Sequence, residues 1–351
     1  MGAPTDSGVD TPIGIESSAV SAWLDENVPG AQGPYRFEVI AGGHSNLTFS
    51  VIGSDGRRMV LRRPPLSHGL ASAHDMGREH RVISGLATSS LPVPTTLGMC
   101  DDESVNGAPF YVMAHVDGTV IRDEETARSA LDSDGRSNAS RSLIDNLAAL
   151  HAIDPHDVGL EGLGRHDGYL ARQLKRWYGQ WNAQKTRDLP LVDEVHDALL
   201  ADLPEQTSVS IVHGDYRLDN TMLAADGTVA AILDWEICTL GDPLADIGLL
   251  AVYWTGPNDE PSAWVAPATR VEGFWDRADL ITRYGEVSGR DLSRLDVYVA
   301  FASWKLACIL EGVYARYLGG ALGSRDPAEL EPFRQQVDAA AQRAADIMGA
   351  R

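Results

Sequence analysis

Two short stretches of the 351-residue chain decide its fold: HGDYRLDN over residues 213–220 and LDWE over residues 233–236. Four residues separate Asp215 from Asn220, and Asp234 ends an apolar run that follows a turn. This order predicts a carboxylate and an amide in one loop and a second carboxylate at the end of a strand. Phosphoryl transfer needs such a set, because a carboxylate must align the acceptor hydroxyl and oxygen ligands must hold Mg²⁺.

The same residues permit two other interpretations. A His-x-Asp sequence with nearby carboxylates also occurs in metallohydrolases, and three polar residues can belong to an ordinary turn. The agreement of order, spacing and strand context favours phosphoryl transfer over both. His213 fits a structural histidine better than a proton shuttle, because Asp215 already takes the acceptor's proton in this scheme.

Upstream of these stretches, residues 1–115 predict a small N-terminal lobe. Helical spacing of apolar residues predicts a helix capped at Ser17 or Ser18 and another helix over residues 73–86. Alternating apolar residues and turn signals predict five antiparallel strands. Those strands are expected at residues 36–40, 47–52, 59–62, 96–99 and 109–113. Residues 116–118 are then expected to form a hinge.

Beyond the hinge, residues 116–351 predict a larger, mainly helical C-terminal lobe. One β-rich island, at residues 209–212, 221–223 and 229–233, surrounds the HGDYRLDN stretch. The pair Asp242-Pro243 predicts the start of the next helix, with Asp as the cap and Pro in the first turn. The expected fold class is therefore α+β, with two lobes of different composition.

Residues 211–248 resemble the aminoglycoside phosphotransferase family, which shares its fold with protein kinases and choline kinases. The resemblance implies a bilobal protein-kinase-like fold and an ATP- and Mg²⁺-dependent transfer of the γ-phosphate to a hydroxyl of a small-molecule acceptor. By position, it implies that Asp215 is the catalytic base and that Asn220 and Asp234 are the Mg²⁺ ligands. It also implies that His213 braces the catalytic loop.

The resemblance implies further supporting and nucleotide-binding residues. Asp246 would anchor the catalytic loop from the following helix. A glycine-rich turn would fold over the phosphates, Arg62 would hold them while paired with Glu79, and the segment after Phe110 would receive the adenine. The residues expected to bind the nucleotide are Gly42, Gly43, Ser45, Asn46, Arg62, Glu79, Met113 and His115. A plain hairpin at the glycine pair and a buried connecting strand at residues 110–116 are the alternatives.

Arg62 stands where protein kinases place an ATP-binding lysine. Arginine also binds phosphates, but through a planar fork that is always charged. Arg63 is the neighbouring alternative, although strand alternation would point it to the opposite face. The stretch VLRRPP over residues 60–65 resembles a branch of the family associated with acyl-CoA dehydrogenases. The missing lysine also leaves open a catalytically silent nucleotide-binding module.

The acceptor stays open between aminoglycosides, hydroxyacyl-CoA thioesters, choline-like alcohols and sugars. A net charge of −21 mildly favours a cationic acceptor and argues against nucleic-acid and membrane partners. Arg172, Lys175 and Arg176 are candidates for binding a polyphosphate tail, although a solvent-facing helix explains them as well. Three widely spaced cysteines and the absence of a signal sequence predict a cytoplasmic protein without disulfides.

Overall fold

The structure is a computed structural model that describes residues 11–40, 46–66, 75–259, 267–320 and 327–349. The chain divides into two compact units. The first unit contains Met1–Asp117 together with Leu233–Glu236, and the second contains Gly118–Ile232 and Ile237–Arg351. The short segment that carries Asp234 therefore belongs to the first unit, although the residues on both sides of it in the chain belong to the second.

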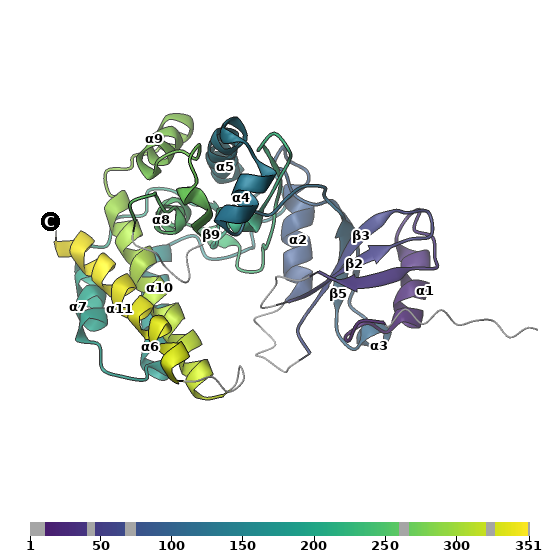
Figure 1. The fold of residues 1–351 in the computed structure, drawn as a ribbon, viewed down its shortest axis with the longest axis horizontal. Coiled ribbons are helices and arrows are strands. Elements are labelled where there is room, and N and C mark those ends of the chain that lie inside the picture. The colour runs from purple at the N-terminus through teal and green to yellow at the C-terminus, as the bar shows by residue number, and fades with distance from the viewer. Residues whose placement is uncertain (1–10, 41–45, 67–74, 260–266, 321–326, 350–351) are drawn as a thin grey trace, which may run out of the picture. The chain divides into compact units, whose positions relative to one another are not determined.

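The first unit is built on a five-stranded antiparallel sheet, as the sequence predicts (Figure 1). The strand order is β1-β2-β3-β5-β4, and each neighbouring pair is antiparallel. The strands are β1 (Arg36–Val39), β2 (Leu47–Ile52), β3 (Arg58–Arg63), β4 (Thr96–Cys100) and β5 (Phe110–Ala114). Three helices complete the unit: α1 (Ser17–Asn27), α2 (Met76–Leu86) and α3 (Glu103–Asn106).

Strand alternation gives the sheet two chemically different faces. One face packs Phe49, Leu61 and Val112 against Leu24 of α1 and forms the hydrophobic core of the unit. Because successive side chains of a strand point to opposite faces, Arg62 points away from this core, and its guanidinium meets Glu79 of α2. The sheet thus separates a structural face from a charged face.

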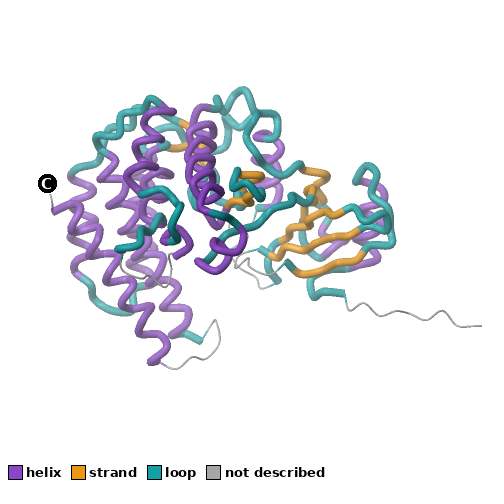
Figure 2. Tube along the Cα trace, turned by 45° about the horizontal axis from the view of Figure 1, so that its top comes forward, coloured by secondary structure: helices purple, strands orange, loops and turns teal. Residues whose placement is uncertain are grey.

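The second unit is mostly helical and surrounds two small strand pairs (Figure 2). Strand β6 (Ser210–Val212) pairs with β9 (Thr239–Gly241), and β7 (Thr221–Leu223) pairs with β8 (Val229–Ile232). The 3-10 helix η2 (Leu218–Asn220) lies between β6 and β7. The α-helices are α4 (Glu124–Ala130), α5 (Ser133–Ala152), α6 (Tyr169–Gln184), α7 (Pro190–Ala201), α8 (Leu244–Tyr253), α9 (Arg277–Ser288), α10 (Leu295–Leu318) and α11 (Pro327–Gly349).

Helix α10 is the central helix of the second unit and packs against α6, α7, α8 and α11. Among the helices that the structure describes, it is the one whose length and composition would suffice to cross a membrane. However, 72% of its most apolar window is buried inside the protein, as expected of the core helix of a folded domain.

The structure corrects several predicted boundaries. Ser17 and Ser18 lie inside α1, whose cap position is held by Glu16. Helix α2 starts at Met76, because the Asp75 carboxylate accepts the backbone N–H of Arg78 and caps it. Helix α8 starts at Leu244, one residue later than expected, and the Asp242 carboxylate accepts the Leu244 N–H from outside the helix.

Among the elements that were not predicted individually are a short helix and a short strand. The acidic stretch after β4 contains the one-turn helix α3, which Asp102 caps by accepting the Ser104 N–H. Strand β9 pairs with β6, and no alternation is detectable over only three residues. The three cysteines, Cys100, Cys238 and Cys308, are free and buried, in agreement with the expected absence of disulfides.

Candidate active site

The buried carboxylate of Asp246 holds the backbone of the HGDYRLDN stretch, the predicted catalytic loop, which follows β6. Its Oδ2 accepts the His213 N–H at 2.7 Å, and its Oδ1 accepts the Gly214 N–H at 2.8 Å. Gly214 has φ +86°, a conformation that favours glycine, and an added Cβ would lie 3.1 Å from the Ile237 side chain. The turn that presents Asp215 therefore depends on a glycine and on one buried carboxylate.

One of the two carboxylate oxygens of Asp215 accepts hydrogen bonds from neighbouring side chains. Its Oδ2 accepts the Asn220 side-chain amide at 2.9 Å and the Arg217 Nε–H at 3.2 Å. Asn220 also donates to the Asp215 backbone carbonyl at 2.8 Å. Within the ranges that the structure describes, the Oδ1 atom of Asp215 has no partner. This carboxylate oxygen is therefore oriented and free to accept a hydroxyl.

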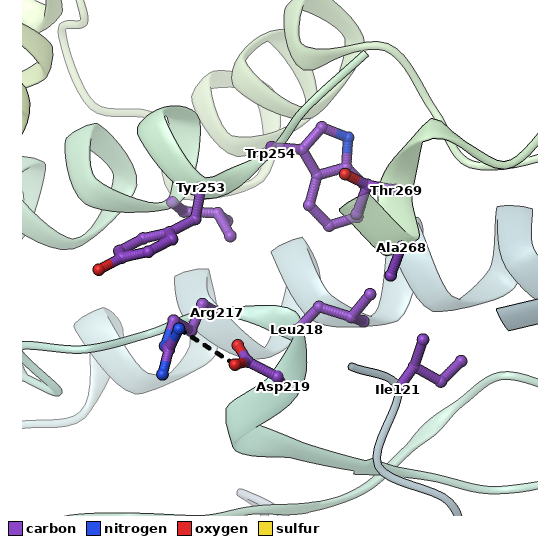
Figure 3. Close-up of a pocket in the computed structure, with 9 residues that line it drawn as sticks. Ile121, Arg217, Leu218, Asp219, Tyr253, Trp254, Ala268 and Thr269 are labelled. Carbon is purple, nitrogen blue, oxygen red and sulfur yellow. Dashed lines mark ion pairs between the residues drawn. The ribbon is translucent and has the colours of Figure 1, made fainter. Parts of the chain in front are cut away.

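The Arg217 guanidinium ties the catalytic loop to α8. It forms an ion pair with Asp219 at 3.0 Å and lies 4.9 Å from the centroid of the Tyr253 ring (Figure 3). These residues line a cavity of about 20 Å³, large enough for roughly one water molecule. Burial raises the pKa of Asp219, although the charge of Arg217 opposes the shift.

A second cluster of charged residues lies in the first unit around Arg62. Its guanidinium lies 2.6 Å from Asp234 and 3.4 Å from Glu79. Burial, opposed by the charge of Arg62, raises the pKa of Glu79 to about 7. Asn46 donates to Glu236 at 3.0 Å within the same unit. Arg62 thus holds the LDWE segment against β3 and α2.

Asp234 has an unusual backbone. Its φ is +65°, and it is the one non-glycine residue with a positive φ in the part of the chain that the structure describes. Aspartate tolerates this conformation better than most residues, but it still stores strain, as functional sites often do. The Arg62 pair engages Oδ1 of Asp234 and leaves its Oδ2 available.

Asn220 and Asp234 offer the donors that Mg²⁺ prefers. The amide nitrogen of Asn220 donates to Asp215, which leaves its Oδ1 oxygen available, and Asp234 supplies a carboxylate oxygen. The described residues contain no group of three His, Cys, Asp or Glu side chains arranged to hold a metal. Each residue therefore carries an oxygen of the kind that Mg²⁺ binds, and Mg²⁺ usually takes one or two protein ligands with phosphate oxygens and water.

Comparison with known proteins now identifies the chain. The sequence profile described as the phosphotransferase enzyme family, APH, matches residues 36–281, well over half of the chain. The chain belongs to this family. The predicted resemblance to aminoglycoside phosphotransferases is thereby confirmed, and so is the predicted protein-kinase-like fold.

Relatives of this phosphotransferase family member include parts of longer proteins. Acyl-CoA dehydrogenase family member 11 of Rattus norvegicus is 33% identical over 324 residues, which cover 88% of the chain and 40% of the relative. Acyl-CoA dehydrogenase family member 10 of Mus musculus is 31% identical over 340 residues, which cover 92% of the chain and 30% of the relative. The chain spans about two fifths or less of these relatives, and the predicted link to the acyl-CoA dehydrogenase branch is confirmed.

Solved structures agree with this assignment. A Ralstonia eutropha protein, provisionally assigned as an aminoglycoside phosphotransferase, is 31% identical, with a TM-score of 0.80 over 94% of this chain and 98% of that one. A choline kinase from Cryptosporidium parvum is 12% identical, with a TM-score of 0.64 over 95% and 97%. Aminoglycoside phosphotransferase APH(4)-Ia, in complex with ADP and hygromycin B, is 18% identical, with a TM-score of 0.59 over 94% and 98%. The last two show the fold alone.

The remaining predicted site residues fall into two groups. Gly42, Gly43 and Ser45 lie outside the residues that the structure describes. Met113 is buried near the end of β5, and His115 follows that strand. Burial and the charge of Arg58 lower the pKa of His115. For all of these residues, a role in nucleotide binding stays a prediction.

Three residues that contact or interact with the predicted site residues were not singled out from the sequence. Tyr111 is buried on the charged face of the sheet beside Glu79. His151 lies between Asp246, at 3.2 Å from its Nε2, and the Tyr284 hydroxyl, at 2.7 Å from its Nδ1. Lys305, on α10, donates to the Gly214 carbonyl. One signal was available for Lys305: it is one of only three lysines and interrupts a long apolar helix.

The His151 imidazole should make stability depend on pH. Burial lowers its pKa below the ordinary value of 6.5, although the hydrogen bond to Asp246 opposes the shift. The unfolded state therefore binds more protons than the folded state once the pH falls below about 6.5, so stability rises with pH there. We expect the free energy of unfolding to fall between pH 7 and pH 5, by at most about 1.4 kcal/mol per pH unit from this group.

Urea unfolding at several pH values would measure this effect. His151→Gln should flatten the slope, whereas His156→Gln, at an exposed position, should leave it unchanged. An unaltered slope in His151→Gln would show that another group is responsible.

Proposed function

We propose that this phosphotransferase moves the γ-phosphate of ATP to a hydroxyl group of a small molecule in a Mg²⁺-dependent reaction. One observation carries the proposal: Asp215 has one oxygen fixed by Asn220 and Arg217 and one oxygen free. Membership of the phosphotransferase family supports it. So do structures of the same fold that contain ADP or GDP.

In this proposal Asp215 orients the acceptor hydroxyl and takes its proton as the reaction proceeds. The acceptor oxygen forms a bond to the γ-phosphorus, the bond from that phosphorus to the bridging oxygen breaks, and ADP leaves. The proton passes from Asp215 to solvent. Arg217 and Asn220 keep the carboxylate aimed, so little reorganisation is needed during transfer.

The other roles are assigned by chemistry. Asn220 and Asp234 are the proposed Mg²⁺ ligands, and bound Mg²⁺ would neutralise charge that develops on the phosphates. Arg62, with Glu79, is proposed to hold the phosphates in place of a lysine. Asp246 and His213 support the loop, since Asp246 accepts the His213 and Gly214 N–H groups. Gly42, Gly43, Ser45, Asn46, Met113 and His115 remain the proposed nucleotide contacts.

The class of acceptor and the absence of catalytic activity are the two points on which alternatives remain. Aminoglycosides, hydroxyacyl-CoA thioesters, sugars and choline-like alcohols are all acceptors compatible with Asp215. A catalytically silent nucleotide-binding module is the alternative from a different class, suggested by Arg62 in place of lysine. A cytoplasmic location and lobes divided at residues 115–116 are part of the same proposal.

Measurement of ADP release tests the proposal. The purified chain is mixed with ATP and Mg²⁺ and then with one acceptor of each class. Acceptor-dependent ADP release, with the phosphorylated product seen by mass spectrometry, is the expected result. A thermal shift with Mg-ATP but no product from any acceptor class would favour the silent module, and the absence of both effects would refute nucleotide-dependent transfer.

Asp234→Asn tests the proposed metal ligand. Asparagine also tolerates positive φ, so the backbone should persist while a charged ligand is lost. ATP at about 100 times its Kd should stabilise the wild type by about 2.7 kcal/mol. We expect Mg²⁺ to add nothing to the ATP-dependent thermal shift of the variant. Asp226→Asn, at another turn carboxylate, should behave as wild type. An undiminished Mg²⁺ effect in Asp234→Asn would remove Asp234 from the proposed site.

A further inference from the structure

Lys305 reaches the catalytic loop from the middle of α10. Its Nζ donates to the Gly214 carbonyl at 3.4 Å, directly before Asp215 in the chain. The same ammonium lies 5.5 Å from the centroid of the Trp177 ring on α6. Most neighbouring residues of α10 are apolar and buried, so a lysine here is an exception to the composition of the helix.

The ammonium group of Lys305 is poorly satisfied. It has three donors, and the one hydrogen bond that the described residues provide is long. Among the described residues, Lys305 forms no ion pair within 4.0 Å. Burial lowers the pKa of Lys305, although Asp215 and Asp246 oppose the shift. Lys305 is only half-buried, so its two remaining donors can be satisfied by water or by a bound ligand.

A second cation lies beside the same aromatic ring as Lys305. Arg176 is exposed, and its guanidinium carbon lies 5.4 Å from the centroid of the Trp177 ring. The charge of Arg176 also lowers the pKa of Lys305. Lys305 and Arg176 are thus two cations beside one aromatic ring, and the carboxylates of Asp215 and Asp246 also act on Lys305.

A structural role explains only part of this arrangement. The Gly214 carbonyl can be satisfied by a neutral donor or by water, without the cost of desolvating a cation. Lys305 has no direct ion pair with Asp215, although the charge of Asp215 raises the pKa of Lys305. What remains unexplained is a set of ammonium donors beside the carboxylate that is proposed to receive the acceptor.

We propose that Lys305, with Arg176 and Trp177, binds an oxyanion of the acceptor, so that the preferred substrate is an anionic hydroxy compound. This inference rests on the proposed function of Asp215. A carboxylate or a phosphate group of the acceptor would complete the hydrogen bonds of the ammonium, and Trp177 would contact its apolar part. A polycationic acceptor would instead bring like charges together, which disfavours aminoglycosides.

Lysine protection tests binding without turnover. Because Lys175, Lys185 and Lys305 are the only lysines, an amine-acylating reagent followed by peptide mass spectrometry reports on each one. The probes are 3-hydroxybutyrate for a carboxylate, glycerol 3-phosphate for a phosphate and kanamycin for a polycation. At about ten times Kd, an anionic probe should slow acylation of Lys305 about tenfold. Lys185 is the internal control and should not change.

The outcomes distinguish a carboxylate from a phosphate as the group that Lys305 binds. Protection by 3-hydroxybutyrate alone assigns a carboxylate, and protection by glycerol 3-phosphate alone assigns a phosphate. Protection by both supports the shared chemistry. Protection by kanamycin, or by neither anion, overturns the inference. If an anion protects Lys305 but no acceptor yields a phosphorylated product, the proposed function fails while anion binding at Lys305 stands.

Variants then separate recognition from loop positioning. Lys305→Met removes the charge and keeps a similar volume, and we expect Kd and KM for the protecting anion to rise about 10- to 100-fold, from the loss of a charged hydrogen bond. Lys305→Arg should recover part of this loss, and Lys185→Met should have no effect. A fall in kcat with Kd and KM unchanged would mean that Lys305 only positions the loop and would overturn the inference.

Discussion

Asparagine in place of Asp215 is expected to lower kcat by about 10²- to 10⁴-fold, the usual contribution of a positioned general base. Asparagine keeps the shape of the side chain but cannot take the acceptor's proton. Its Oδ1 can still accept from Asn220 or Arg217, so the loop should remain folded. ADP release with a verified acceptor measures the effect, and a thermal shift with ATP shows whether nucleotide binding survives.

Asp219→Asn is the matched control for this change. It removes a carboxylate from the same loop and loosens the pair with Arg217, but it leaves the proposed base in place. We expect a loss of less than about tenfold, since an indirect effect on Arg217 is worth only about 1 kcal/mol. Equal turnover by Asp215→Asn and wild type would remove Asp215 from its proposed role.

Alanine in place of Asp246 is expected to lower the free energy of unfolding by about 3–5 kcal/mol, the usual cost of removing one partner from a buried charged network. Asp246 is 1% exposed and accepts from the His213 N–H, the Gly214 N–H and His151. Alanine leaves these donors buried and without an acceptor. Urea unfolding followed by circular dichroism measures the change.

Asp145→Ala provides the comparison on the protein surface. Asp145 pairs with Arg283, but both side chains are more than one third exposed, so its loss should cost less than about 1 kcal/mol. If Asp246→Ala proved no more destabilising than Asp145→Ala, the catalytic loop would not depend on its buried carboxylate. Reduced turnover in Asp246→Ala below its unfolding range would show that loop order is also needed for activity.

Most of the architecture was accessible from sequence because it rests on local patterns. Alternating apolar residues and turn signals predicted the five strands of the first unit. The order and spacing of its polar residues predicted the role of the HGDYRLDN stretch. The pairing of β6 with β9 was not accessible, since three-residue strands carry no period and their partners are far apart in the chain. Helix α3 was missed because a single turn cannot show helical spacing.

The predicted site residues likewise differ in whether a local sequence pattern could reveal them. Spacing predicted Asp215, Asn220 and Asp234, because they belong to two short segments. The positions of Lys305 and His151 beside the loop depend on tertiary packing of α10 and α5, which no local pattern encodes. Likewise, the sequence placed Arg62 on a strand but could not show that it pairs with a residue 172 positions away.

Because Leu233–Glu236 belongs to the first unit, the N-terminal unit cannot be separated from the rest of the chain by one cut after Asp117. A gene fragment that ended at Asp117 would encode Arg62 without Asp234, and the guanidinium would lose a main counter-ion on the charged face of the sheet. We therefore expect residues 1–117 expressed alone to be less stable than the same residues in the whole chain. A gene fragment that is meant to encode the whole N-terminal unit has to extend as far as the LDWE segment.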